Sequence, residues 1–64
     1  MTDILIANHG TIVLLHPQTP VADAWLRESV SDEAQWWAGA LVVEPRYVGD
    51  LITGLLADDL SVAS

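Results

Sequence analysis

Two aliphatic runs near the N-terminus constrain the fold most, because both of their faces are apolar. Residues 3–7 read DILIA and residues 11–16 read TIVLLH, and the segment Asn-His-Gly separates these two β-rich runs. Asn8 and Gly10 both tolerate a positive φ, so the segment predicts a tight hairpin turn. Successive side chains of a strand point to opposite faces, and both alternating sets are aliphatic here. A sheet built on this hairpin therefore has two apolar faces.

Two helices are predicted after the hairpin. Thr19 is placed as an N-cap and Pro20 at the first helical position, and apolar residues then recur at helical spacing up to Val30. Trp25 lies in the middle of this helix among apolar neighbours, and we expect it in the core. Pro45 opens a second helix with one apolar face.

Residues 39–44 (GALVVE) are predicted as a further strand, and residues 60–63 (LSVA) as a short edge strand. The chain is thus expected to form one domain over residues 1–64. Its predicted class is α+β, a small two-layer ββαβαβ domain with a four-stranded mixed sheet and two helices. The strand-helix-strand connections favour right-handed crossovers and parallel neighbours beside the antiparallel hairpin. If both helices share one side of the sheet, its other face must meet another chain.

The size of the chain supports the same expectation. A 64-residue domain buries about 60 % of the surface of its extended chain, yet 52 % of the residues are hydrophobic and no cysteine is present. Either the surface is unusually apolar or a second chain covers part of it, so we expect a homodimer or a partner-bound protein. No apolar run is long enough for a membrane span, and the N-terminus lacks the basic region of a signal peptide. A cytoplasmic location is the resulting expectation.

The charge of the chain restricts its partners. Nine Asp and Glu residues face two Arg and no Lys, which gives a net charge of −7. Direct binding to nucleic acid or to an anionic membrane is disfavoured, because both need basic side chains. A protein partner with a basic surface is favoured, and a metal ion is a second option. The alternative is that the acidity only keeps an apolar small protein soluble.

The sequence offers little for catalysis. His9 is expected in the hairpin turn and His16 at the far end of the following strand, about 20 Å away, so the two cannot share a metal ion within one chain. No nucleophile elbow or phosphate-binding loop is present, and the adjacent Asp58 and Asp59 diverge on a helix without a third ligand. We therefore expect no enzyme activity, no catalytic or metal-binding residue and no cofactor.

The adjacent tryptophans Trp36 and Trp37 are the first candidates for partner binding. Neighbouring strand residues point to opposite faces, so one ring is expected to close the core against a helix and the other to face the open side. By strand alternation, Trp37 falls on the face of Leu41 and Val43. Trp and Tyr dominate protein contacts, which adds Tyr47. The alternative is that both tryptophan rings pack within the monomer.

Two acidic pairs, Asp32 with Glu33 and Asp58 with Asp59, are the other candidates for partner binding. Asp58 and Asp59 are expected at the C-terminal end of the second helix, where the helix dipole prefers cations. They are therefore expected to engage a basic surface, although a solvated acidic face is the simpler interpretation.

The segments NHGTIVLLHP and DEAQWWAGALVVEPRYVGDL resemble a family of very short uncharacterised proteins of bacteria and phages. The family pattern is approximately ENHGSI, an aliphatic strand, Pro-Leu-Thr, a Trp-bearing helix, then DAQWFGGALVVEHRY and an Asp-Leu helix; the resemblance, summarised as NHG-(T/S)-I and DAQW(F/W)xGALVVExRY, covers Asn8 to about Leu60. The chain departs from it at Ala7, Trp37, Ala38 and Pro45, where the pattern has Glu, Phe, Gly and His. The resemblance implies no activity for this chain. By size and charge alone, the chain is also similar to anti-CRISPR proteins.

Two functions remain open from the sequence. The first is a non-enzymatic interaction protein, such as a phage or mobile-element inhibitor that mimics DNA and blocks the basic nucleic-acid groove of a host defence complex. The second is a homodimeric bacterial housekeeping module that binds an unidentified ligand at the sheet edge.

Overall fold

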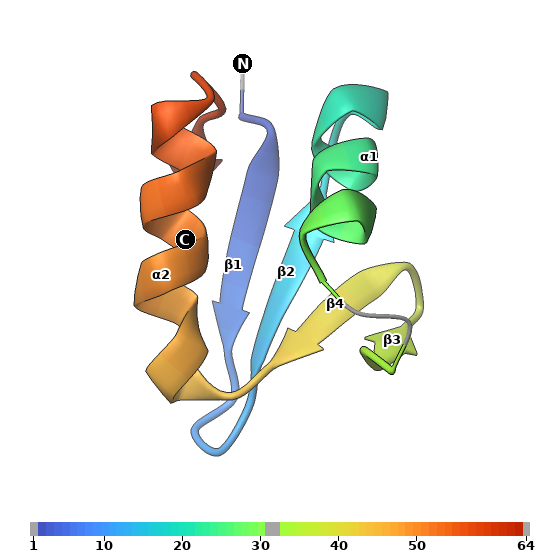
Figure 1. The fold of residues 1–64 in the computed structure, drawn as a ribbon. Helices are drawn as coiled ribbons and strands as arrows, with labels where there is room; N and C mark the ends of the chain where they lie inside the picture. The colour runs from blue at the N-terminus through green and yellow to red at the C-terminus, as the bar shows by residue number, and fades with distance from the viewer. Residues whose placement is uncertain (1, 31–32, 64) are drawn as a thin grey trace.

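The computed structural model describes residues 2–30 and 33–63, which form a helical layer packed on a mixed sheet (Figure 1). The predicted α+β class and both predicted helices are confirmed, but the sheet has five strands instead of four. Its strand order is β3-β4-β2-β1-β5. The elements are β1 (Ile4–Asn8), β2 (Val13–Pro17), α1 (Pro20–Ser29), β3 (Trp36–Trp37), β4 (Ala40–Val43), α2 (Pro45–Ala57) and β5 (Val62–Ala63).

The direction of β4 corrects one prediction. β4 pairs with β2 in antiparallel orientation, whereas a simple strand-helix-strand crossover would make these neighbours parallel. The extra strand β3 is the reason, because the chain leaving α1 first runs through β3 and then reverses into β4. The parallel pair is instead β1 with β5, at the edge opposite β3.

The predicted hairpin between β1 and β2 is confirmed. Gly10 has a φ of 84°, a conformation in which a glycine has no steric penalty. The Asn8 side-chain oxygen accepts a hydrogen bond from the Gly10 amide at 2.8 Å. The His9 amide donates to the Ile12 carbonyl at 2.9 Å and closes the loop. The turn therefore follows from local side-chain and backbone preferences.

The start of α1 is tied to both ends of the chain through Asp3. Thr19 caps the helix, since its hydroxyl oxygen accepts a hydrogen bond from the Ala22 amide at 3.1 Å, and Pro20 opens the first turn. The Thr19 hydroxyl also donates to Asp3 at 3.1 Å, and the Ser61 amide donates to the other Asp3 oxygen at 2.9 Å. The Ser61 hydrogen bond holds the pKa of Asp3 below its usual value.

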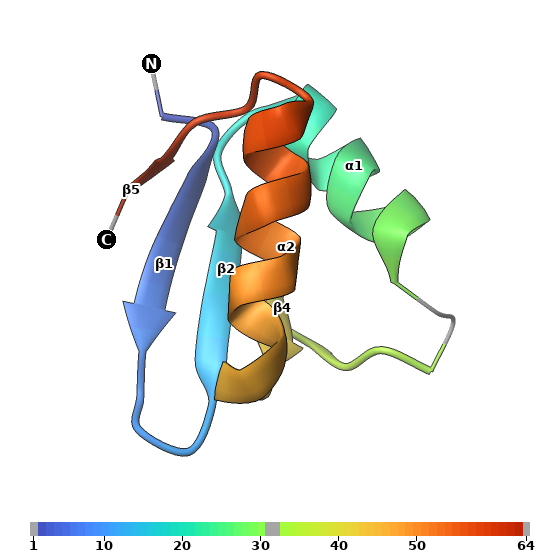
Figure 2. The same ribbon diagram turned by 60° about the vertical axis from the view of Figure 1, so that its left-hand side comes forward.

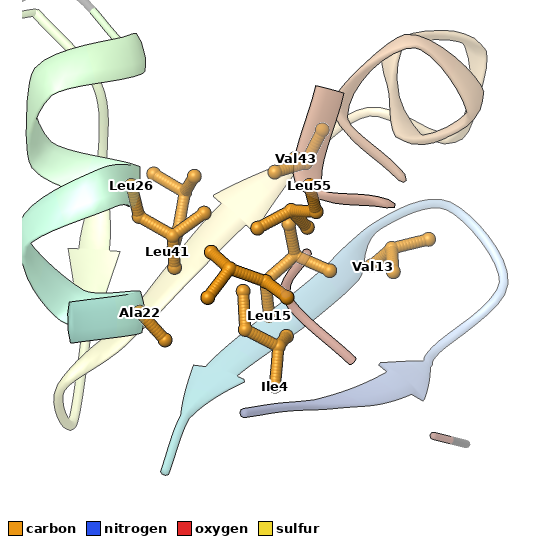
Figure 3. Close-up of a cluster of buried hydrophobic side chains, with 9 residues drawn as sticks. Ile4, Val13, Leu15, Ala22, Leu26, Leu41, Val43 and Leu55 are labelled. Carbon is orange, nitrogen blue, oxygen red and sulfur yellow. The ribbon is translucent and has the colours of Figure 1, made fainter. Parts of the chain in front are cut away.

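Both helices lie on the same side of the sheet (Figures 1 and 2). Their inner faces, with Leu26 of α1 and Leu55 of α2, pack in a single cluster with one face of the sheet. Figure 3 shows this cluster converging between the helices and the strands. The sheet residues at its centre are Ile4, Val13, Leu15, Leu41 and Val43. No helix among the described residues covers the opposite face, which is the arrangement that the sequence predicts to need another chain.

Candidate functional site

The two tryptophans lie in a tight hairpin that the sequence interpretation missed. Ala38 and Gly39 form a two-residue loop in which both φ angles are positive, 50° and 82°, as a type I′ turn requires. Trp37 pairs with Ala40, and Trp36 pairs with Leu41. Paired residues share a face of the sheet, so Trp36 and not Trp37 lies on the face of Leu41. The prediction that Trp37 shares the face of Leu41 and Val43 was wrong, because it treated residues 37–43 as one continuous strand and did not include the turn at Ala38 and Gly39.

The prediction that the two rings separate to opposite sides is confirmed. Trp36 lies on the helical side, packs against the core cluster and has the Arg27 guanidinium 4.3 Å from its ring centre. Arg27 also pairs with Asp23 at 2.9 Å, which orients the guanidinium over the ring. Trp37 lies on the opposite side of the sheet and is 64 % exposed. A ring of this size in water is a candidate anchor for a partner.

The sheet face away from the helices, here called the open face, carries Trp37 and a set of smaller side chains. The ladder pairs Leu5 with His16 and Ala63, and Leu14 with Ala7 and Val42. Leu5 is 41 % exposed, whereas Leu14 is only 4 % exposed although no described helix covers it. The strand residues of the open face are Leu5, Ala7, Leu14, His16, Trp37, Ala40, Val42 and Ala63. None of them is an Asp, Glu, Lys or Arg.

A shallow hollow of about 750 Å³ deepens the open face beside Trp37. Leu14 and Val42 contribute to its lining, together with Ile12 from the β1–β2 loop. Its lining also includes His9, one of the two histidines for which the sequence offered no role. The open face is therefore an indented apolar surface with the Trp37 ring at one end.

The predicted acidic pair at the end of α2 has structural partners. Asp58 caps the helix, and its carboxylate accepts a hydrogen bond from the indole N–H of Trp25. Trp25 is half-buried and packs against the core cluster, where the sequence predicts it. Asp59 has a φ of 62°, the left-handed conformation typical of the residue after a helix C-cap. The Leu60 amide then donates to the Leu55 carbonyl at 2.9 Å, which completes a Schellman motif.

The other acidic pair is only partly described. Asp32 lies outside the described residues, and Glu33 is exposed in the segment between α1 and β3. Glu33 shares an open groove with Tyr47, Glu44 and Asp50 of the α2 N-terminal region. Tyr47 is 50 % exposed and has the Arg46 guanidinium 4.9 Å from its ring centre.

The predicted site residues therefore fall in separate places. Trp37 lies on the open face, Trp36 lies under Arg27, Glu33 and Tyr47 line the groove, and Asp58 and Asp59 end α2. One feature of the sequence could have pointed to the groove: the acidic residues Glu44 and Asp50 lie next to apolar positions of the second helix. Nothing in the sequence indicates that these residues line the same groove as Glu33.

The carboxylates of the described residues all lie outside the strands. They occur just before β1, on α1, in the segment after α1, and at the cap, surface or end of α2, at positions Asp3, Asp23, Glu28, Glu33, Glu44, Asp50, Asp58 and Asp59. The two arginines are engaged, Arg27 with Asp23 and Arg46 with Glu44 at 3.2 Å. The molecule thus separates an acidic helical layer from an uncharged open face.

Within residues 2–30 and 33–63, no three His, Asp or Glu side chains gather as a metal ion would require. In the same part of the chain, no helix has the length and apolar character needed to cross a membrane. Comparison with protein-family models, with curated proteins and with solved structures finds no match to this chain.

Proposed function

We propose that this protein is a non-enzymatic protein-binding domain that self-associates through its open face and presents its acidic helical layer to a basic surface of another protein. The separation of charge between the two sides of the sheet carries this proposal. Because the open face holds no carboxylate among its strand residues, two copies can meet there without bringing like charges together.

The size of the surface agrees with a dimer. A standard interface buries about 800 Å² per partner, roughly a fifth of the 4194 Å² surface of this domain. One side of a two-layer domain supplies an area of that order. Trp37 and Leu5, at opposite ends of the open face, are exposed apolar anchors that a second copy would remove from water.

Self-association through the open face leaves the helical layer outward. The chain has a net charge of −7, the described carboxylates lie outside the strands, and pairing two copies through the open face would double the acidic surface. A surface of this kind attracts cationic proteins at long range. The narrower hypothesis is that the basic surface is a nucleic-acid groove of a host defence complex. It is tested by whether double-stranded DNA competes with this protein for the same partner.

Sedimentation velocity at micromolar concentration tests the proposed dimer. Wild-type protein is expected to sediment at about twice the mass of the 6.9 kDa chain. Leu5→Glu places a charge in the open face and should weaken self-association by about 100-fold or more, because each copy then buries an unpaired carboxylate. The matched control is Leu56→Glu, which makes the same change at a 55 % exposed position of α2. A monomeric wild type, or equal effects of the two substitutions, would contradict the proposal.

A further inference from the structure

The two helices touch at one end and leave an open groove at the other. A Cβ placed on Gly54 in the C-terminal half of α2 would lie only 3.1 Å from the Trp25 ring of α1. The indole of Trp25 also donates to Asp58, so this end of the layer is closed. Near the start of α2, a groove of about 740 Å³ lies between that helix on one side and Val30 with residues 33–35 on the other. Figure 1 shows β4 running between the two helices at this end.

This interhelical groove has an apolar floor and an acidic rim. Val30, Leu41 and Leu51 contribute to the floor from the end of α1, from β4 and from α2. Glu33 contributes to the rim on one side, and Glu44 and Asp50 contribute to it on the other.

The rim keeps a negative charge after its own ion pair is counted. Arg46 pairs with Glu44 at 3.2 Å and neutralises that carboxylate. Glu33 and Asp50 are exposed, and neither side-chain carboxylate forms a hydrogen bond or an ion pair with another residue in the described ranges 2–30 and 33–63. Two carboxylates on the rim are therefore available to a cation from outside.

We infer that the interhelical groove binds a cationic and partly apolar segment of a partner protein, with arginine or lysine at the rim and an aliphatic side chain on the floor. This inference rests on the proposed function, because it names the site that receives the basic partner. Charge complementarity selects a cationic occupant, and the apolar floor selects against a purely hydrophilic one.

Two further observations agree with that occupant. The volume of the groove lies within the range of roughly 300–1,000 Å³ that ligand-binding pockets occupy. Tyr47, which also lines the groove, is 50 % exposed, so the part of its ring not covered by the Arg46 guanidinium can contact an arginine of a partner.

Ile12, Gln35 and Val42 line both this groove and the hollow of the open face, whereas the rim residues Glu44 and Asp50 belong to the N-cap and first turns of α2, in the helical layer away from the open face (Figure 2). Self-association through the open face therefore leaves the acidic rim accessible.

The probe is a fluorescein-labelled Arg-Leu repeat hexapeptide, titrated with the full chain and followed by fluorescence anisotropy. Two peptides of the same length serve as controls, an all-arginine peptide and a Glu-Leu repeat. The Arg-Leu peptide is expected to bind most tightly. In a ¹H–¹⁵N spectrum, the amides of Val30, Val43 and Leu51 should shift, while those of Leu5 and Ala63 should not.

Two double variants of equal net charge separate the groove from diffuse attraction. Glu33→Gln with Asp50→Asn removes the rim carboxylates, and Glu28→Gln with Asp59→Asn removes two exposed carboxylates that do not line the groove, so each variant has a net charge of −5 instead of −7. The rim variant should bind the Arg-Leu peptide about tenfold more weakly, and the control about as wild type does.

Equal loss in both variants, or amide shifts confined to the open face, would overturn the groove site. The sedimentation result for Leu5→Glu stands apart from this experiment, because the groove variants leave the open face intact. A dimer whose groove does not bind the peptide therefore refutes this inference alone. A groove that binds in a monomeric wild type refutes the proposed self-association alone.

Discussion

Replacing Asp59 by glycine should stabilise the domain, because two features of the structure work against an aspartate there. The residue has a φ of 62°, which costs free energy for any residue with a Cβ. It also places a negative charge directly after the C-terminus of α2, where the helix dipole is unfavourable for anions. Glycine removes both costs and preserves the Schellman hydrogen bonds, which are made by the backbone.

The two effects are small but large enough to measure. Relief of the left-handed backbone should contribute about 0.5–1 kcal/mol, less than for alanine, because aspartate tolerates this conformation better than most residues. Loss of the charge at the helix end should add a few tenths of a kcal/mol. The free energy of unfolding should therefore rise by about 1 kcal/mol, which raises the melting temperature by roughly 4–8 °C in a domain of this size.

Urea unfolding followed by tryptophan fluorescence measures the change, and two further variants divide it. Asp59→Asn removes the charge and keeps a side chain that tolerates the left-handed conformation, so it should give only the smaller gain. Asp59→Ala removes the charge but keeps the backbone cost, so it should be less stable than Asp59→Gly. Equal stability of the alanine and glycine variants would refute the assignment of a strained left-handed residue after α2.

Three other changes are expected to alter stability. Ala38→Gly should raise the urea midpoint, since it removes the Cβ from a positive φ in the β3–β4 turn; a lower midpoint would contradict the type I′ turn. Asp3→Asn should destabilise the domain near pH 7. The Ser61 hydrogen bond lowers the pKa of Asp3, so the ionised carboxylate stabilises the fold above its usual pKa, and this stabilisation is lost as the pH falls below about 4. The free energies of unfolding of wild type and variant should therefore converge in urea titrations at acid pH. Trp25→Phe should lower stability by about 1 kcal/mol through loss of the hydrogen bond to Asp58, and the combined Trp25→Phe and Asp58→Asn variant should lose little more in a double-mutant cycle.

The sequence by itself determined the elements whose signals are local. The N-cap at Thr19, the prolines at the starts of both helices and the Asn-His-Gly turn act within a few residues, and each lies where the sequence predicts it. The two apolar faces of the first hairpin could also be predicted from the sequence, because side-chain alternation in a strand follows from backbone geometry alone.

Only the tertiary structure decided how these elements pair. The type I′ turn at Ala38 escaped the sequence interpretation because an alanine rarely adopts a positive φ, and without the turn Trp37 was assigned to the wrong face. The same reversal sets β4 antiparallel to β2.

The placement of both helices on one side depends on contacts between residues far apart in the chain, such as Leu26 and Leu55 in one cluster. No local preference encodes such contacts, because their free energy arises only when distant apolar faces are buried together. For the same reason, the acidic layer, the open face and the groove between Glu33 and Asp50 exist only in the folded domain.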